Sequence, residues 1–240
     1  MDHLVEINGK KLFYTDIGKG KTIVFIHGWL ESHTAFDNLA SVLSSKYRCI
    51  SIDIPGFGKS DQINNVNLNK ISKTIELLLN KLNVRKYNLV GHSLGGAIAL
   101  VYADRNKDEI SKIVLISPFI TFKQLSKSVF YIIRNIIPVA INKIMNWKNP
   151  NLYAVNAFKI MYILSSTDLY KYLRKVRKDI LLVYGTKDSL LSIRPLQPLL
   201  GIMNNIHLAI FEDVRHYIFT YNSEELAHKI DLFFSHDTVQ

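Results

Sequence analysis

The chain has 240 residues, of which 48% are apolar and 21% charged, and its formal net charge at pH 7 is +10. This composition is typical of a packed globular protein and excludes a disordered or collagen-like chain. The single cysteine, Cys49, excludes an intramolecular disulfide and a zinc site built from thiolates, and its apolar neighbours predict a buried, unreactive thiol.

The N-terminus contains Asp2 and Glu6 and lacks the basic segment and long apolar run of a secretory signal. We therefore expect a cytoplasmic protein.

Short runs rich in β-branched residues recur along the chain and alternate with longer stretches of helical period. This alternation is typical of a mostly parallel sheet with helices on both faces. The first two strands are joined by Asn8-Gly9, a hairpin turn signal, so they should be antiparallel. The eight predicted strands are residues 4–7, 12–17, 22–27, 48–53, 87–91, 113–117, 180–184 and 207–211.

Five helices are predicted between these strands. In residues 68–82 the apolar side chains recur at helical spacing and form one face, which should pack on the sheet. The predicted helices are residues 33–44, 68–82, 94–105, 192–203 and 224–234. The sequence thus predicts an α/β fold with an eight-stranded, mostly parallel sheet.

The alternation breaks once, between residues 118 and 178, where the pattern is helical and contains no convincing strand. A structureless loop of this length is uncommon in compact domains, so we expect a helical cap over residues 119–178. Residues 1–118 and 179–240 would form the core. The most apolar stretch, residues 129–147, is interrupted by Arg134, Pro138 and Lys143 and is therefore not expected to cross a membrane.

A candidate nucleophile lies in Gly91-His92-Ser93-Leu94-Gly95, between a predicted strand and a predicted helix. On such a sharp turn the Ser93 hydroxyl is exposed, and the glycines allow the neighbouring backbone to approach closely. The helix N-terminus offers amide groups to a developing oxyanion. The alternative is a glycine-rich turn with a capping serine, but the strand-to-helix placement favours the nucleophile.

A serine hydroxyl needs a base, and the base needs a carboxylate that orients it. After a nucleophile of this kind the partners follow in the order acid, then histidine. Asp188 follows the strand at 180–184, and His216 follows the strand at 207–211. Taken alone, each is more simply a turn aspartate or a surface histidine; together, at strand ends and in order, they favour a triad with Ser93.

Four other carboxylates were compared with Asp188. Glu212 and Asp213 are too close in sequence to His216, and Asp179 precedes its strand. Asp53, within residues 53–60, is the serious rival, and we interpret that segment as a structural turn.

The loop after the third strand, His27-Gly28-Trp29, is placed to provide an oxyanion donor. The candidate donors are the backbone amides of Trp29 and Leu94. We expect His27 to stabilise the loop and take no part in proton transfer.

With these motifs the sequence resembles the α/β-hydrolase superfamily over nearly its whole length, and within it the small carboxylesterases and lipases with a helical lid. The matching segments are His27-Gly28-Trp29, residues 53–60, Gly91 to Gly96, Gly185-Thr186-Lys187-Asp188 and His216. The resemblance implies an acyl-enzyme mechanism with Ser93, Asp188 and His216 and without metal or organic cofactor.

The expected reaction is hydrolysis of a carboxylic ester or thioester with a medium-sized apolar acyl group. Serine at the nucleophile position argues against haloalkane dehalogenases and epoxide hydrolases of this fold, which use aspartate there. C–C bond hydrolases, cofactor-free lyases, perhydrolases and thioesterases stay open, as does a non-catalytic binding protein.

The predicted cap contains eleven basic residues and one acidic residue, Asp168, so its excess charge equals that of the whole chain. Aromatic and aliphatic residues alternate with these cations. This pattern suits an acyl chain on an anionic carrier, or a lipid at an anionic membrane surface. The alternative is a solvated basic face over a packed cap. Nucleic acid is not expected, because no nucleic-acid recognition motif is recognised.

Overall fold

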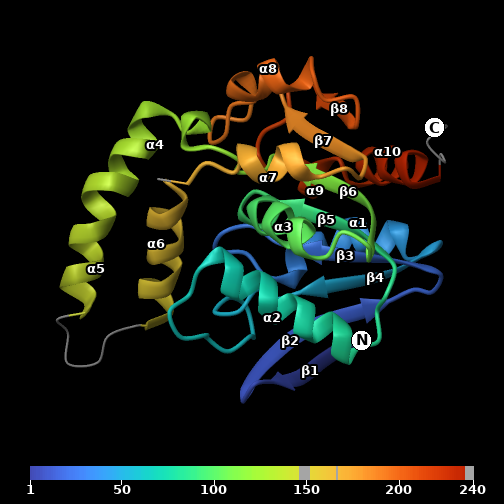
Figure 1. Ribbon diagram of the computed structural model, residues 1–240, viewed down its shortest axis with the longest axis horizontal. Coiled ribbons are helices and arrows are strands. Elements are labelled where there is room, and N and C mark those ends of the chain that lie inside the picture. Colours follow the sequence, from blue (N-terminus) through green and yellow to red (C-terminus); the bar gives the residue numbers. More distant parts are fainter. Residues whose placement is uncertain (146–151, 166, 236–240) are drawn as a thin grey trace.

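The computed structural model describes residues 1–145, 152–165 and 167–235 (Figure 1). Its centre is an eight-stranded sheet in the order β1-β2-β4-β3-β5-β6-β7-β8. β1 and β2 form the predicted antiparallel hairpin, β2 also runs antiparallel to β4, and the other neighbours are parallel. The strands are β1 Asp2–Ile7, β2 Lys10–Ile17, β3 Lys21–Ile26, β4 Tyr47–Ile52, β5 Tyr87–His92, β6 Ile110–Ile116, β7 Ile180–Gly185 and β8 Ile206–Phe211. The predicted sheet is confirmed.

Two apolar layers form because successive side chains of a strand point to opposite faces. In β3, Val24 and Ile26 join a cluster with α2 (Leu68–Lys81), α3 (Leu94–Arg105) and α7 (Tyr170–Lys175). Ile23 and Phe25 join a second cluster with α1 (Asp37–Leu43), α9 (Ile218–Tyr221) and α10 (Ser223–Ser235). Helices therefore cover both faces of the sheet, as Figure 1 shows.

Cys49 lies in β4 with no exposed surface. Burial raises the pKa of its thiol to about 12. The thiolate is therefore scarce at neutral pH, and the expectation of an unreactive cysteine is met.

The helix predicted at residues 192–203 is shorter in the structure. It consists of a 3₁₀ turn, η4 (Arg194–Leu196), and a four-residue helix, α8 (Gln197–Leu200). Pro195 and Pro198 lack the amide hydrogens that a longer helix would need at these positions. Residues 33–44 likewise divide into a 3₁₀ turn, η1 (His33–Phe36), and α1.

Between β6 and β7 the chain leaves the sheet and forms several helical segments. They are η2 Phe122–Gln124, α4 Lys127–Tyr131, the π-helical turn η3 Ile132–Ile136, α5 Ile137–Met145, α6 Leu152–Leu164 and α7. In Figure 1, α4, α5 and α6 stand to one side of the sheet, whereas α7 contacts α3. The bounds of the cap, residues 119–178, stay a prediction.

Segments α4, η3 and α5 form one helix, Lys127–Met145, of 19 residues. Its mean hydropathy is 1.3, so by length and composition it could cross a membrane. Only 11% of its most apolar window is buried inside the structure. This helix is therefore unlike the buried helices of the core.

Candidate active site

Ser93 lies on a strained turn between β5 and α3. Its backbone has φ 52° and ψ −111°, a conformation that costs a non-glycine residue about 1–3 kcal/mol. The Ser93 amide donates to the Ile116 carbonyl at 3.0 Å, which fixes the turn on β6. A Cβ atom on Gly95 would lie 1.9 Å from the Ile26 carbonyl oxygen, so only glycine allows this close packing. The fold therefore holds the turn in the strained form expected of a nucleophile.

His216 donates from Nδ1 to Asp188 Oδ2 at 2.8 Å, and both side chains are almost completely buried. Asp188 follows β7 and His216 follows β8, which are neighbouring parallel strands. The two loops are joined directly, because the Lys187 amide donates to the Val214 carbonyl at 2.9 Å. The structure thus brings together the acid and the base chosen from the sequence.

The environment of Asp188 favours its charged form. Burial opposes ionisation, but the hydrogen bond and electrostatic attraction of His216 and the amide of Leu191 hold the pKa of Asp188 below its usual value. Asp188 Oδ1 accepts hydrogen bonds from the Leu190 and Leu191 amides at 3.0 Å each. A carboxylate fixed in this way keeps a proton on His216 Nδ1 and leaves Nε2 as the basic nitrogen.

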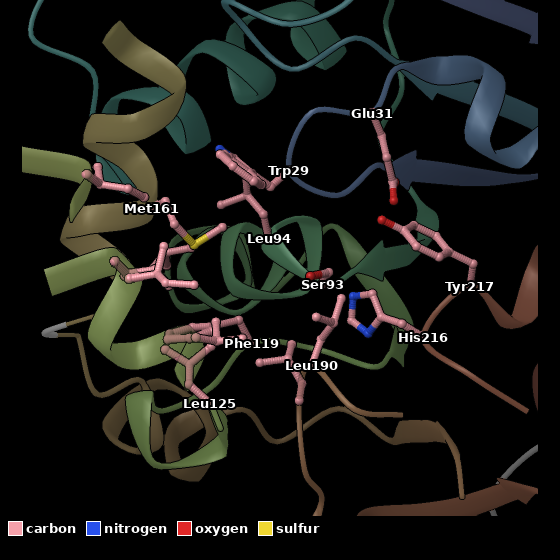
Figure 2. Close-up of a pocket in the computed structure, with 16 residues that line it drawn as sticks. Trp29, Glu31, Ser93, Leu94, Phe119, Leu125, Met161, Leu190, His216 and Tyr217 are labelled. Carbon is pink, nitrogen blue, oxygen red and sulfur yellow. The ribbon is translucent and has the colours of Figure 1, made fainter. Parts of the chain in front are cut away.

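Ser93 and His216 line one cavity of about 270 Å³ (Figure 2). Figure 2 shows the Ser93 hydroxyl beside the His216 ring. Apart from these two residues, Glu31 and Tyr217, the lining is apolar and includes Phe119 and Met161. A reacting carbonyl at Ser93 would therefore lie with its substituents in an apolar chamber.

The two residues whose amides were chosen as oxyanion donors lie beside this cavity. Trp29 and Leu94 both line it, and within the described residues neither backbone amide has a hydrogen-bond acceptor. Leu94 is the first residue of α3, where amides lack an intrahelical partner. Both groups are therefore available to an oxyanion. The Trp29 indole Nε1 also donates to the Ala157 carbonyl of α6 at 2.9 Å, which ties the loop to the cap helices.

His27 has a structural position, as expected. It is completely buried, its Nδ1 donates to the Gly28 carbonyl at 2.8 Å, and its Nε2 accepts from the Ile54 amide at 3.0 Å. Burial lowers the pKa of His27, which favours the neutral ring that these two bonds require.

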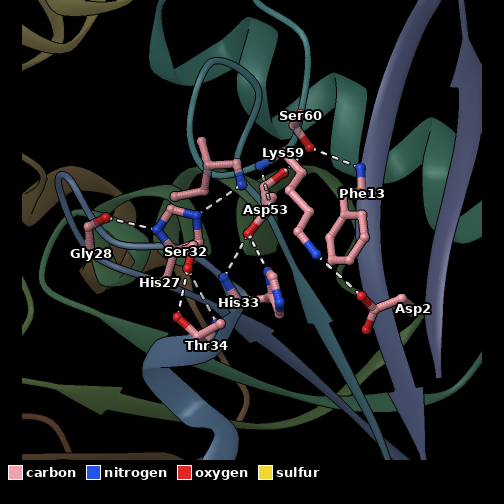
Figure 3. A network of polar contacts seen from close by, with 11 residues as sticks. Asp2, Phe13, His27, Gly28, Ser32, His33, Thr34, Asp53, Lys59 and Ser60 are labelled. Carbon is pink, nitrogen blue, oxygen red and sulfur yellow. Dashed lines mark hydrogen bonds and ion pairs between the residues drawn. The ribbon is translucent and has the colours of Figure 1, made fainter.

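Asp53, the rival acid, pairs with a different histidine (Figure 3). Its Oδ1 accepts from the His33 amide at 2.6 Å and from His33 Nδ1 at 2.9 Å. Its Oδ2 accepts from the Lys59 amide at 2.7 Å, and Ser60 Oγ donates to its carbonyl at 2.8 Å. Asp53 and His33 are not among the residues that line the cavity. The segment is therefore a structural turn, as interpreted from the sequence.

Glu31 and His92 were not selected from the sequence, yet they join the parts of the site. Glu31 Oε2 accepts from the Gly28 amide at 2.6 Å and from His92 Nδ1 at 3.1 Å. His92 Nε2 lies 3.3 Å from the His216 carbonyl oxygen. Burial opposes ionisation of Glu31, but His92 and the Gly28 amide hold the pKa of Glu31 below its usual value. A signal was present, because an acid three residues after Gly28 can accept from its amide.

Within the described residues, no three His, Cys, Asp or Glu side chains gather closely enough to hold a metal ion. The side chains of the site are instead a hydroxyl, an imidazole and carboxylates in an apolar cavity. Such a set is suited to proton transfer and nucleophilic attack.

Comparison with protein families finds one matching model, described as alpha/beta hydrolase fold, over residues 21–155. A solved esterase from Exiguobacterium antarcticum superposes with a TM-score of 0.81. It is 20% identical and covers 98% of this chain and 100% of its own chain. At this identity the structural likeness concerns the fold alone.

Two curated relatives match the chain over part of their length. The AB hydrolase superfamily protein YisY of Bacillus subtilis is 32% identical over 109 residues, which are 44% of this chain and 41% of the relative. A cis-3-alkyl-4-alkyloxetan-2-one decarboxylase of Shewanella oneidensis is 33% identical over 120 residues. This match covers 48% of this chain and 38% of the decarboxylase. The match thus spans about two fifths of each of these relatives.

Proposed function

Because this chain belongs to the α/β-hydrolase fold family, we propose that it is a serine hydrolase that cleaves a carboxylic ester or thioester. One observation supports this most strongly: Ser93 on a strained turn and His216, hydrogen-bonded to Asp188 at 2.8 Å, line the same apolar cavity. Acyl transfer requires an activated nucleophile and donors that stabilise the oxyanion, and Ser93 and the two amides would provide them.

In the first half of the proposed reaction, Ser93 Oγ attacks the carbonyl carbon while His216 Nε2 takes the hydroxyl proton. The carbonyl π electrons move to the oxygen, which the amides of Trp29 and Leu94 stabilise. When the tetrahedral intermediate collapses, the C–O or C–S bond breaks and His216 returns the proton to the leaving alcohol or thiol. The acyl group is then bound to Ser93 as an ester.

In the second half a water molecule replaces the alcohol or thiol. His216 takes one proton from the water, whose oxygen attacks the acyl carbon, and the same two amides stabilise the new oxyanion. Collapse returns the proton to Ser93 Oγ and releases the carboxylic acid. Asp188 stays ionised throughout and stabilises the imidazolium form of His216.

The cavity supports an apolar acyl group of moderate size. Its volume of about 270 Å³ is near the lower end of ligand pockets, which are roughly 300–1,000 Å³. Leu125, Ile133 and Met161 are among the side chains that would contact the acyl chain. A short chain would leave part of this surface unfilled, and a long chain would need to reach out past the cap helices.

A panel of p-nitrophenyl esters of increasing acyl length tests this proposal. The wild-type protein should hydrolyse them with a maximum at medium length, and Ser93→Ala should remove the activity. Ser60→Ala is the matched control, because Ser60 is buried in the Asp53 turn outside the cavity. Equal rates for the wild type and Ser93→Ala would refute the assignment.

A second candidate function uses the same triad on a ketone-type or lactone substrate, as a C–C bond hydrolase or cofactor-free lyase. It is favoured by the similarity to the Shewanella oneidensis decarboxylase. Fluorophosphonate labelling of Ser93 without turnover of any ester in the panel would support this alternative. Tight retention of a ligand with neither labelling nor turnover would instead support a binding protein.

A further inference from the structure

The outward face of the helix Lys127–Met145 exposes large apolar side chains in a row. Tyr131 is 61% exposed, Ile136 51% and Val139 67%, and these positions lie on one side of the helix. Single exposed apolar residues are normal on soluble proteins, but a continuous row marks a surface that contacts something else. We call Tyr131, Ile136 and Val139 the outer row; Ile132 is 46% exposed but also lines the cavity beside Ser93.

The opposite face of the same helix forms a wall of the active-site cavity. Val129, Ile133 and Ile137 line the cavity, and the last two are 4% and 7% exposed. One helix thickness therefore separates the outer row from the space beside Ser93. Material that contacts the outer row would therefore lie beside a wall of this cavity.

The stretch of chain that contains the outer row carries only positive charges. The sequence has no Asp or Glu between Glu109 and Asp168. Lys127 and Lys143 are exposed near the two ends of the helix, and the Arg134 guanidinium lies 4.7 Å from the Tyr162 ring centre on α6. An apolar row flanked by lysines is complementary to a bilayer with anionic headgroups, which offers negative charge above an apolar interior.

We propose that the helix Lys127–Met145 docks on an anionic lipid bilayer, with its outer row in the interfacial layer and Lys127 and Lys143 at the headgroups. Membrane-resident acyl esters would then lie beside the wall of the active-site cavity. This substrate class rests on the proposed serine hydrolase function, whereas the docking does not. With the cytoplasmic location that we also propose, the bilayer would be the anionic inner leaflet.

The helix should lie on the membrane and not cross it, although its length would allow a span. A crossing would carry Arg134 toward the bilayer centre, which is strongly unfavourable. It would also remove Ile133 and Ile137 from the cavity that they close. The start of the helix is held by η2, because Gln124 bonds to Pro118, Ile120 and Tyr184 of the core.

The test measures binding to vesicles of phosphatidylcholine, with or without phosphatidylserine, by sedimentation. Ile136→Ser/Val139→Ser should lower binding to anionic vesicles about tenfold. The control Ile202→Ser/Tyr221→Ser, which changes residues 70% and 88% exposed outside the cap, should leave binding unchanged.

Lys127→Gln/Lys143→Gln should lower binding to anionic vesicles about fivefold per lysine and should not alter binding to neutral vesicles. The control Lys19→Gln/Lys107→Gln also removes two exposed lysines and should have no effect. Added salt should weaken wild-type binding to anionic vesicles.

Three results would overturn the proposal. They are no binding to anionic vesicles, equal binding by the outer-row variant, and binding that resists alkaline carbonate extraction, which would indicate a crossing helix. Retention on polyglutamate without vesicle binding would point to an acidic protein carrier instead. Turnover of water-soluble p-nitrophenyl acetate is measured in parallel, so vesicle binding without turnover would refute the hydrolase function and leave the docking intact.

Discussion

Asp188 and Asp53 each pair with a buried histidine, and replacing each by asparagine should separate catalysis from stability. The distances are similar, 2.8 Å from Asp188 to His216 Nδ1 and 2.9 Å from Asp53 to His33 Nδ1. Only the first pair includes a residue, His216, that lines the cavity beside Ser93. The two substitutions remove the same charge from equally paired sites, so each serves as the control of the other.

Asp188→Asn should lower kcat about 10³- to 10⁴-fold, equivalent to roughly 4–5.5 kcal/mol. Asparagine can keep Oδ1 as the acceptor for the Leu190 and Leu191 amides, so the loop should hold. The amide NH₂ would then face His216 Nδ1 and favour the tautomer with its proton on Nε2. That tautomer cannot accept the proton of Ser93.

Asp53→Asn should leave kcat per folded molecule unchanged and lower the free energy of unfolding by about 2–4 kcal/mol. Both Asp53 oxygens accept from N–H groups, two from His33 and one from Lys59. The NH₂ group of asparagine, in place of one oxygen, would face another hydrogen-bond donor, so a charge-assisted hydrogen bond would be lost.

The assay combines urea unfolding, followed by far-UV circular dichroism, with ester hydrolysis normalised to the folded fraction. The rate of fluorophosphonate labelling of Ser93 gives a second readout that needs no substrate. An active Asp188→Asn variant, or a stable Asp53→Asn variant with kcat lowered a hundredfold, would refute the reasoning.

Three further predictions concern neighbouring contacts. Glu31→Gln weakens the hydrogen bonds from Gly28 and His92. We therefore expect kcat to fall about tenfold while KM for a short ester stays unchanged. A rise in KM without a fall in kcat would contradict this. Trp29→Phe keeps the backbone amide but removes the indole hydrogen bond to the Ala157 carbonyl of α6, at a cost of about 0.5–1.5 kcal/mol. KM for medium-chain esters should rise several-fold while hydrolysis of p-nitrophenyl acetate stays constant; equal effects on both esters would count against the contact. Because the pKa of Asp188 is lowered on folding, its contribution to stability is present above its unfolded pKa of about 4 and is lost as pH falls through the folded value. Urea unfolding between neutral and acid pH should show this loss in the wild type and less of it in Asp188→Asn, and parallel curves would refute it.

The sheet could be predicted because its signals are local. Each strand is a short apolar run, and the hairpin turn Asn8-Gly9 and the strand-to-helix turn at Ser93 specify particular backbone conformations. The Asp188–His216 pair followed from topology, because the carboxyl ends of parallel strands meet at one edge of the sheet.

The contact between His92 and the His216 loop could not be predicted in the same way. His92 meets the His216 carbonyl across 124 residues of sequence, so nothing in either local pattern indicates the contact. The same holds for the bond from Trp29 to α6 and for the outer row, since the cap has helical patterning on several faces. The short α8 is different, because Pro195 and Pro198 are local sequence signals that limit the length of a helix here.

The nucleophile is tested most directly by intact-mass and peptide mass spectrometry after reaction with a fluorophosphonate. We expect one adduct, on Ser93, that is absent from Ser93→Ala and forms much more slowly in His216→Ala. An adduct at another serine, or labelling of Ser93 that His216→Ala leaves at the wild-type rate, would contradict it.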